Sequence, residues 1–209
     1  MGTRGFIGFV INGQEKIAYN HWDSYPAGLG ADMLSFLHNS DMDVVRQQAA
    51  DLRVVAPDSS PTDEDVERLH GYADTGVSSG NIREWYVLLR GTQGNPALML
   101  EAGVIEDAGE FPLDSLFAEW GYVIDFDANV FEVYKGFQDA PHELGRFASR
   151  TFSEGDERER SKNFFTGNSY HPCALVASFP LDLLPSAKLF LDTVNPREEG
   201  EEEDESTED

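Results

Sequence analysis

The dipeptide Asn12-Gly13 constrains the fold of this chain more than any other local feature. It separates two short runs rich in apolar residues, 6–11 and 16–19. Asn-Gly readily adopts the two positive φ angles of a type I′ turn, so this stretch predicts a tight β-hairpin near the N-terminus. The first run is apolar on both of its faces, which predicts a strand inside a sheet and not at its edge.

Helical periodicity marks the stretch that follows the hairpin. We expect helices within residues 30–39, 41–55, 62–73, 81–94 and 95–103. Thr62 is a predicted N-cap, because three acidic residues follow it and favour the positive end of the helix dipole. Gly103 is expected to end the last of these helices.

The second half of the chain returns to strand periodicity. Tyr122, Ile124 and Phe126 alternate with other residues, a turn is expected at 127–129, and residues 172–181 predict a final strand. The order of hairpin, helices, hairpin and strand predicts an α+β fold with a mainly antiparallel sheet packed with helices. We expect one domain over residues 1–195, with a polar, charged loop near 151–165.

Acidic residues dominate the charge of the chain, whose formal net charge is −24. Nine of the 39 acidic residues follow Arg197, so residues 1–197 still carry a net charge of −15. Residues 196–209 lack apolar side chains to bury and are expected to form a disordered acidic tail. Such a surface repels phosphate groups, so we expect neither direct nucleic-acid binding nor attachment to an anionic membrane. A nucleic-acid mimic and a solubilising surface are both open interpretations.

The cellular compartment is predicted from three features that the sequence lacks: a membrane-spanning stretch, a signal peptide and a pair of cysteines. No stretch approaches the roughly 20 apolar residues that span a bilayer, and the first residues do not form the pattern of a signal peptide. Cys173 is the single cysteine, so an internal disulfide cannot form. We therefore expect a cytoplasmic protein.

The loop that follows the first hairpin, YNHWDSYPAGLG at residues 19–30, is the main candidate site. Polar side chains presented at the end of a rigid hairpin are a common way to build a ligand site. His21 is a candidate general base and Asp23 a candidate for orienting it, with Thr3 as a further catalytic candidate. The candidate ligand-binding residues are Asn20, His21, Asp23, Ser24 and Tyr25. The same residues also suit a purely structural corner, held by hydrogen bonds to the backbone.

Other clusters that could carry chemistry are weaker. Asp125, Asp127 and Glu132 could gather beside the second hairpin as an oxygen-rich metal site, although solvated carboxylates beside a turn are favoured. Cys173 begins an apolar run and is interpreted as a thiol of the core. We expect neither a resident metal nor a cofactor.

Two family resemblances accompany these patterns. An N-terminal strand, a tight hairpin and the NHWDS loop resemble the opening of N-terminal-nucleophile amidohydrolases such as class II glutamine amidotransferases. That resemblance implies a nucleophile at the mature N-terminus, but removal of Met1 would expose Gly2, which has none. It implies at most a related scaffold that has lost its catalytic group.

The chain also resembles a protein family of actinobacteria and their phages that has no assigned activity. The stretches that carry this resemblance are residues 3–30, 84–108, 111–138 and 175–185. The resemblance implies a bacterial or phage origin and brings no catalytic residues.

Two functional hypotheses follow. The first is a ligand-binding or catalytically altered protein on an amidohydrolase-like scaffold, and whether it is an enzyme stays open. The second is an acidic protein-interaction factor, phage-encoded and directed at a host component. A structural subunit of a larger assembly is a third alternative.

Overall fold

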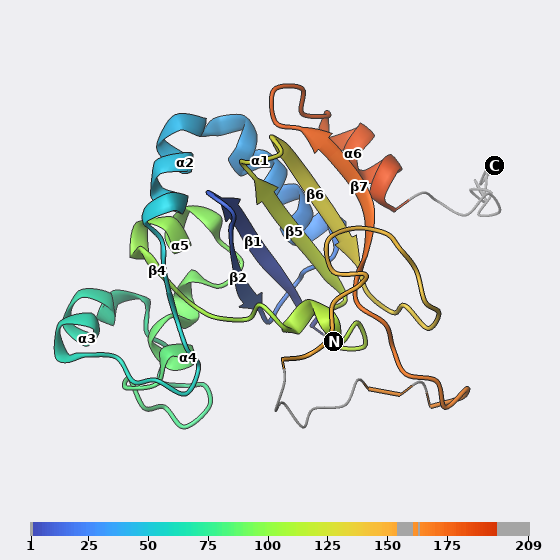
Figure 1. Cartoon of the computed structure of the whole chain (residues 1–209). Helices are drawn as coiled ribbons and strands as arrows, with labels where there is room; N and C mark the ends of the chain where they lie inside the picture. Colours follow the sequence, from blue (N-terminus) through green and yellow to red (C-terminus); the bar gives the residue numbers. More distant parts are fainter. Residues whose placement is uncertain (1, 154–160, 163, 196–209) are drawn as a thin grey trace, which may run out of the picture.

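A five-stranded sheet forms the centre of the computed structural model, which describes residues 2–153, 161–162 and 164–195 (Figure 1). Its strands, in the order in which they lie side by side, are β2 (Gln14–Asn20), β1 (Gly5–Ile11), β5 (Trp120–Asp125), β6 (Val130–Lys135) and β7 (Ala174–Pro180). β1 and β5 are parallel, and the other neighbouring pairs are antiparallel. The predicted α+β fold with a mainly antiparallel sheet is confirmed.

β1 occupies the interior position that its apolar sequence predicts. All seven of its residues are buried, and the turn that ends it has φ angles of 54° at Asn12 and 71° at Gly13. Because β1 and β5 are parallel, their hairpin turns lie at the same end of the sheet. The Asp127 carboxylate accepts hydrogen bonds from the amides of Asn12 at 2.9 Å and Gly13 at 2.7 Å. This carboxylate therefore joins the two hairpins.

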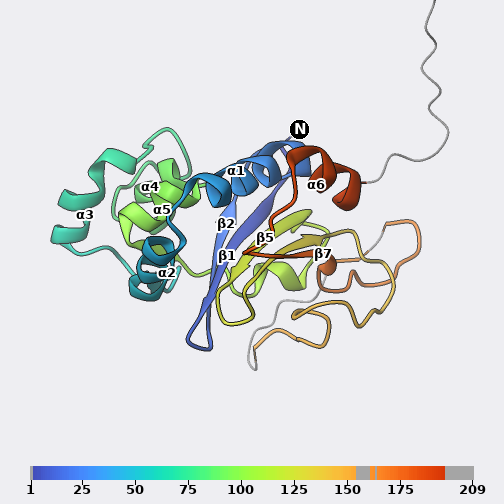
Figure 2. The same ribbon diagram turned by 90° about the horizontal axis from the view of Figure 1, so that it is seen from above.

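Helices cover one face of the sheet, and irregular segments cover the other (Figure 2). The covering helices α1 (Ala31–Asn39), α2 (Met42–Asp51) and α6 (Ala187–Val194) bury side chains against β1, β5 and β6. On the opposite face, Phe6 and Tyr134 pack against Phe147, which belongs to the segment between β6 and β7. The Phe6 ring occupies the space that a side chain at Gly121 would need. This contact requires glycine on β5 beside Phe6.

A smaller lobe extends from the β2 edge of the sheet (Figure 1). Its regular elements are β3 (Arg53–Val55), α3 (Asp63–Leu69), α4 (Trp85–Leu88), α5 (Pro96–Ala102) and β4 (Val104–Glu106), with β3 and β4 paired in parallel. Thr62 caps α3 as predicted, and the side chain of Asp65 completes a capping box. Gly103, with a φ of 66°, ends α5 as expected. The lobe has its own buried cluster of apolar side chains, including Trp85.

Short helical turns complete the element order. They are η1 (Pro26–Gly30), η2 (His70–Tyr72), η3 (Arg90–Thr92) and η4 (Phe111–Leu113). Two helices are shorter than the sequence predicts. The helix expected within 81–94 is only four residues long. Residues 53–55, which were expected to continue α2, form β3 instead. Most of the predicted charged loop near 151–165 and all of the predicted tail at 196–209 lie outside the described residues. Among the described residues, no helix has both the length and the apolar character required to cross a membrane.

Candidate functional site

Buried hydrogen bonds hold the corner that follows β2. The Ser24 hydroxyl accepts a hydrogen bond of 2.8 Å from the Asn20 side-chain amide, and both residues are buried. The Ser24 carbonyl accepts from the Tyr122 hydroxyl on β5 at 2.9 Å, and the Ser24 amide donates to the Thr3 carbonyl at 3.0 Å. Asn20 and Ser24, two of the predicted ligand-binding residues, therefore tie the loop to the sheet.

The other residues predicted in this loop face different surroundings. Thr3 is half-buried, and its backbone carbonyl takes part in the corner described above. Asp23 is exposed, has a positive φ of 49°, and accepts the Leu29 amide on its own backbone carbonyl. Tyr25 is 42% exposed and lines a hollow together with residues of α6. This hollow shares no lining residue with the cavity at Tyr19 described below.

The His21 side chain contacts the side chain of Tyr19, which lines a cavity. Its Nδ1 atom lies 2.7 Å from the Tyr19 hydroxyl. Burial lowers the pKa of His21, and the positive charges of Arg90 and Arg4 lower it further. The imidazole is therefore mainly neutral at pH 7, and its tautomer sets which of Nδ1 and the Tyr19 hydroxyl donates the hydrogen bond. His21 fixes the direction of the Tyr19 side chain.

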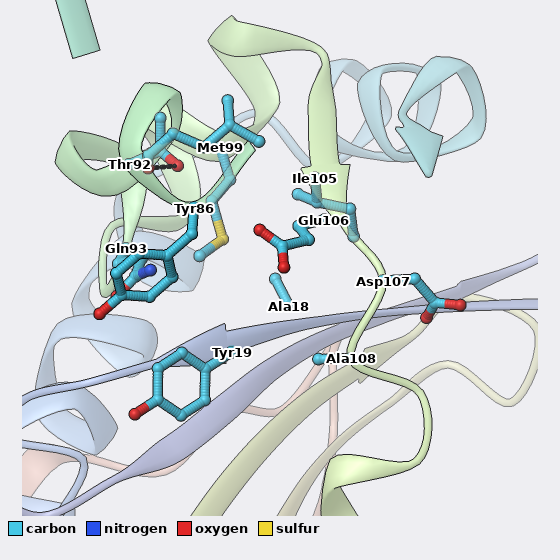
Figure 3. A pocket seen from close by; sticks show the side chains of 11 residues that line it. Ala18, Tyr19, Tyr86, Thr92, Gln93, Met99, Ile105, Glu106, Asp107 and Ala108 are labelled. Atoms are coloured by element: carbon cyan, nitrogen blue, oxygen red, sulfur yellow. Dashed lines mark hydrogen bonds between the residues drawn. The ribbon is translucent and has the colours of Figure 1, made fainter. Parts of the chain in front are cut away.

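Tyr19 lines a cavity of about 250 Å³ between β2 and the lobe that contains α4, α5 and β4 (Figure 3). The cavity is lined by Ala18, Tyr19, Tyr86, Leu89, Thr92, Gln93, Met99, Ile105, Glu106, Asp107 and Ala108. Most of these side chains are aliphatic or aromatic, and a few are polar. Such a wall is typical of sites for small organic molecules.

Glu106 places a carboxylate inside this cavity. It is the last residue of β4, and Figure 3 shows its carboxylate directed into the space between Met99, Tyr86 and Ala18. Burial raises the pKa of Glu106, because the surroundings solvate the charged form poorly. Among the described residues, no side chain or amide donates a hydrogen bond to this carboxylate. The cavity therefore contains an acceptor that the protein does not satisfy.

The neighbouring acid, Asp107, is oriented differently. Figure 3 shows its carboxylate at the rim, turned away from Tyr86, and it accepts the Gly109 amide at 2.9 Å. The alternation of side chains along an extended backbone explains why adjacent acids point to opposite sides. Of the two, Glu106 is the one whose carboxylate points into the cavity.

Two tyrosine rings form the wall of the cavity nearest to His21. The ring centroids of Tyr19 and Tyr86 are 6.5 Å apart, with an angle of 40° between the planes. Arg90 lies 5.6 Å from the centroid of Tyr86, and it donates a hydrogen bond to the side-chain oxygen of Gln93. Tyr19 also lines two further hollows, with volumes of about 480 Å³ and 360 Å³. Tyr19 therefore borders all three hollows.

The acids of the second hairpin have structural partners. Arg146 contacts Asp125 at 2.5 Å and Glu132 at 2.7 Å. Asp127, as described above, joins the two hairpin turns. Within the described part of the chain, His, Cys, Asp and Glu do not form a group of three or more that could hold a metal ion. The structure uses these three carboxylates to hold the fold together.

Cys173 is buried, as its apolar context suggests. Its side chain has 0% exposure, and its sulfur donates to the Ala118 carbonyl at 3.1 Å. Burial raises the pKa of the thiol, and the Asp114 carboxylate adds to that effect. A thiol of this kind is a poor nucleophile.

Comparisons with known proteins add no relative. No family model matches the chain, and no curated protein or solved structure is significantly similar to it.

Glu106 and Tyr86 were not predicted as site residues. The signal for Glu106 was slight: Val104 and Ile105 are β-branched and follow the glycine that ends α5, which favours a short strand. Nothing in these three residues indicates which side chain a neighbouring lobe will cover. The position of Glu106 in a cavity results from the packing of α4 and α5 against β2.

Proposed function

We propose that the chain binds a small organic molecule in the cavity between β2 and the lobe of α4, α5 and β4. The observation that carries this proposal is the Glu106 carboxylate, which lies without a hydrogen-bond donor inside a largely apolar cavity. Glu106 is half-buried, and partial removal of an unpaired charge from water costs free energy. A group of this kind in a hollow, with a perturbed pKa, is a reasonable marker of a functional site.

The proposal is limited to binding. Under this proposal the scaffold is amidohydrolase-like, as the sequence resemblance implies, and its catalytic group has been lost. Tyr19 supplies a hydroxyl at the cavity wall, and its contact with His21 holds that hydroxyl in place. This hydroxyl would orient a ligand by hydrogen bonding.

Filling the cavity is the direct test. Ala18 is 5% exposed, and Figure 3 shows its methyl group directed into the cavity. Ala18→Ile would add three carbons there, in a strand that favours β-branched residues. Ala177→Ile makes the same exchange on β7, at the opposite edge of the sheet, and is the matched control.

Ligand-observed NMR with the full chain would compare these variants against a library of small aromatic and aliphatic fragments. We expect several fragments to bind the wild type and Ala177→Ile at millimolar concentration, and to lose binding in Ala18→Ile. Thermal unfolding would check that both variants are folded. An absence of fragment binding to the wild type, or equal binding to both variants, would contradict the proposal.

An acidic protein-interaction factor is the alternative proposal, and the net charge of −15 on residues 1–197 supports it. Under this proposal the partner is basic, the factor is phage-encoded and acts on a host component, and the location is the cytoplasm. Truncation after Asn195 removes nine further acids and would weaken such a complex most at low salt, where screening is least. Ligand binding in the cavity would be unchanged by the same truncation. Affinity measured at two salt concentrations separates the two proposals.

A further inference from the structure

We propose that the group bound by Glu106 is a cation, and that the ligand is a small amine with an apolar body. This inference rests on the proposed binding function and specifies the chemical class of the ligand. It follows from what the cavity offers and from what it lacks.

The first argument is hydrogen-bond complementarity. An ionised carboxylate only accepts hydrogen bonds, so its partner must donate. Arg90, which contacts two residues of the cavity wall, bonds to Gln93 and lies against Tyr86 and Trp22, and it makes no ion pair with Glu106. An ammonium group on the ligand would supply both a donor and the opposite charge.

The second argument is the aromatic wall. Tyr19 and Tyr86 line the same cavity as Glu106. The face of a tyrosine ring attracts a cation electrostatically, and the attraction increases when water is excluded. A carboxylate beside two tyrosine rings suits an ammonium or methylated ammonium better than a neutral hydroxyl.

The third argument is the field of the whole protein. Residues 1–197 carry a net charge of −15, and Asp107 and Glu110 line the hollow that adjoins the cavity. This distribution attracts cations and repels anions on their approach. A carboxylate-bearing or phosphate-bearing ligand would meet repulsion from both the surface and Glu106.

The size of the cavity limits the apolar body. A volume of about 250 Å³ equals the space of about eight liquid water molecules. Met99, Leu89 and Ile105 provide apolar contacts at this scale. A single aromatic ring with a short aminoalkyl group would fill such a space.

Three probes that share a ring and differ in charge test the inference. Binding of benzylamine, benzyl alcohol and benzoate to the full chain would be measured by NMR titration at neutral pH and low salt. We expect benzylamine to bind at least about tenfold more tightly than benzyl alcohol, the gain typical of a charge-assisted hydrogen bond. Benzoate would bind more weakly than either.

Two variants assign the preference to Glu106. Glu106→Gln keeps the shape of the side chain and removes the charge, and we expect it to abolish the preference for benzylamine while benzyl alcohol still binds. Glu67→Gln removes an equal charge from an exposed position on α3 and should leave the preference unchanged. Thermal unfolding of both variants would establish that they are folded.

The outcomes distinguish this inference from the proposed function. If neutral fragments bind and Ala18→Ile prevents it, but benzylamine shows no advantage or keeps it in Glu106→Gln, the ligand is not a cation and the binding function stands. If neither benzylamine nor any library fragment binds the wild type, both ideas fail.

Discussion

Lys16 on β2 reaches across to the main chain of Leu52, with its Nζ atom 2.8 Å from the Leu52 carbonyl oxygen. The same ammonium donates to the carbonyls of Ala49 and Ala50 at 2.8 Å, so all three of its hydrogens are used. These carbonyls belong to the end of α2, where the helix dipole favours a cation. The lysine is only 4% exposed.

This contact helps to place the cavity. β3 starts at Arg53, directly after Leu52, and pairs with β4 so that Val55 lies beside Glu106. Lys16 therefore anchors the strand pair that carries Glu106 to the strand that carries Tyr19. A second contact at this junction is the hydrogen bond of 2.9 Å from the Ala108 amide, just after β4, to the Ile17 carbonyl of β2.

Lys16→Met is expected to destabilise the protein by about 2–3 kcal/mol. The change leaves the carbonyls at the end of α2 without their donor in a buried environment, which costs free energy at each unsatisfied group. Urea unfolding followed by circular dichroism would measure the loss. Lys188→Met is the matched control, because Lys188 makes an exposed pair with Asp192 on α6 and should change stability by less than about 1 kcal/mol. Equal effects of the two substitutions would contradict the anchoring role of Lys16.

Arg146→Met is expected to cost about 3–5 kcal/mol at pH 7. Arg146 pairs with the buried Asp125 and the half-buried Glu132, and its removal leaves both carboxylates without this cation. Burial tends to raise the pKa of Asp125, but hydrogen bonds from Arg146 and from backbone amides outweigh it and hold the pKa below its ordinary value.

The sign of this pKa shift predicts the pH dependence. A carboxyl with a lowered pKa contributes stability above its ordinary pKa, near 4, and the contribution is lost as the pH falls through the lowered value. The stability difference between the wild type and Arg146→Met should therefore shrink below about pH 4. Arg83→Met, which removes an exposed pair with Asp63, is the control. A difference that is independent of pH would show that Arg146 acts by packing alone.

The Cys173 thiol is expected to be unreactive in the native protein. Its side chain is fully buried, so a reagent cannot reach the sulfur. Burial also raises the pKa of the thiol, so little of the reactive thiolate is present. Ellman's reagent should label the folded chain only at the rate of unfolding and should label the denatured chain at once. Rapid labelling of the folded chain would mean that the segment preceding β7 opens locally.

The two hairpins could be predicted from the sequence because their signals are local. Asn12-Gly13 specifies a turn through backbone conformation, and Thr62 specifies a helix start through a hydrogen bond to its own neighbours. The parallel pairing of β1 with β5 joins residues more than a hundred positions apart, for example Phe6 with Gly121. No local pattern encodes such a pairing.

The same distinction explains why the site was only partly predicted. The concentration of polar side chains marks His21 and its loop as a candidate site, and Tyr19 lies at the start of that loop. Glu106 is an ordinary acid in a short strand, and Lys16 is a single lysine at the start of a hairpin strand. Their burial follows from the way the lobe packs on β2, which is a property of tertiary structure.

Glu106→Gln is expected to raise the melting temperature, and the gain should depend on pH. Burial raises the pKa of Glu106 above its ordinary value near 4.3. Below that value the carboxyl is protonated in both the folded and the unfolded chain, and no penalty arises. As the pH rises, the unfolded chain releases this proton first, so the wild type loses stability until the pH exceeds the raised pKa. Glutamine does not titrate, so its advantage should be small near pH 4 and largest near neutrality.

Differential scanning fluorimetry between pH 4 and 8 would measure this gain. Tyr19, Tyr86 and Asp107 are the other titratable residues that line the cavity. Tyr19 stays neutral over this range, because burial raises its pKa above the ordinary tyrosine value of about 10. Asp107→Asn, beside Glu106 but turned toward the rim, is the control and should bring no gain. A gain that is equal in both variants would reflect relief of the general negative charge, and the cavity at Glu106 would then have no special role.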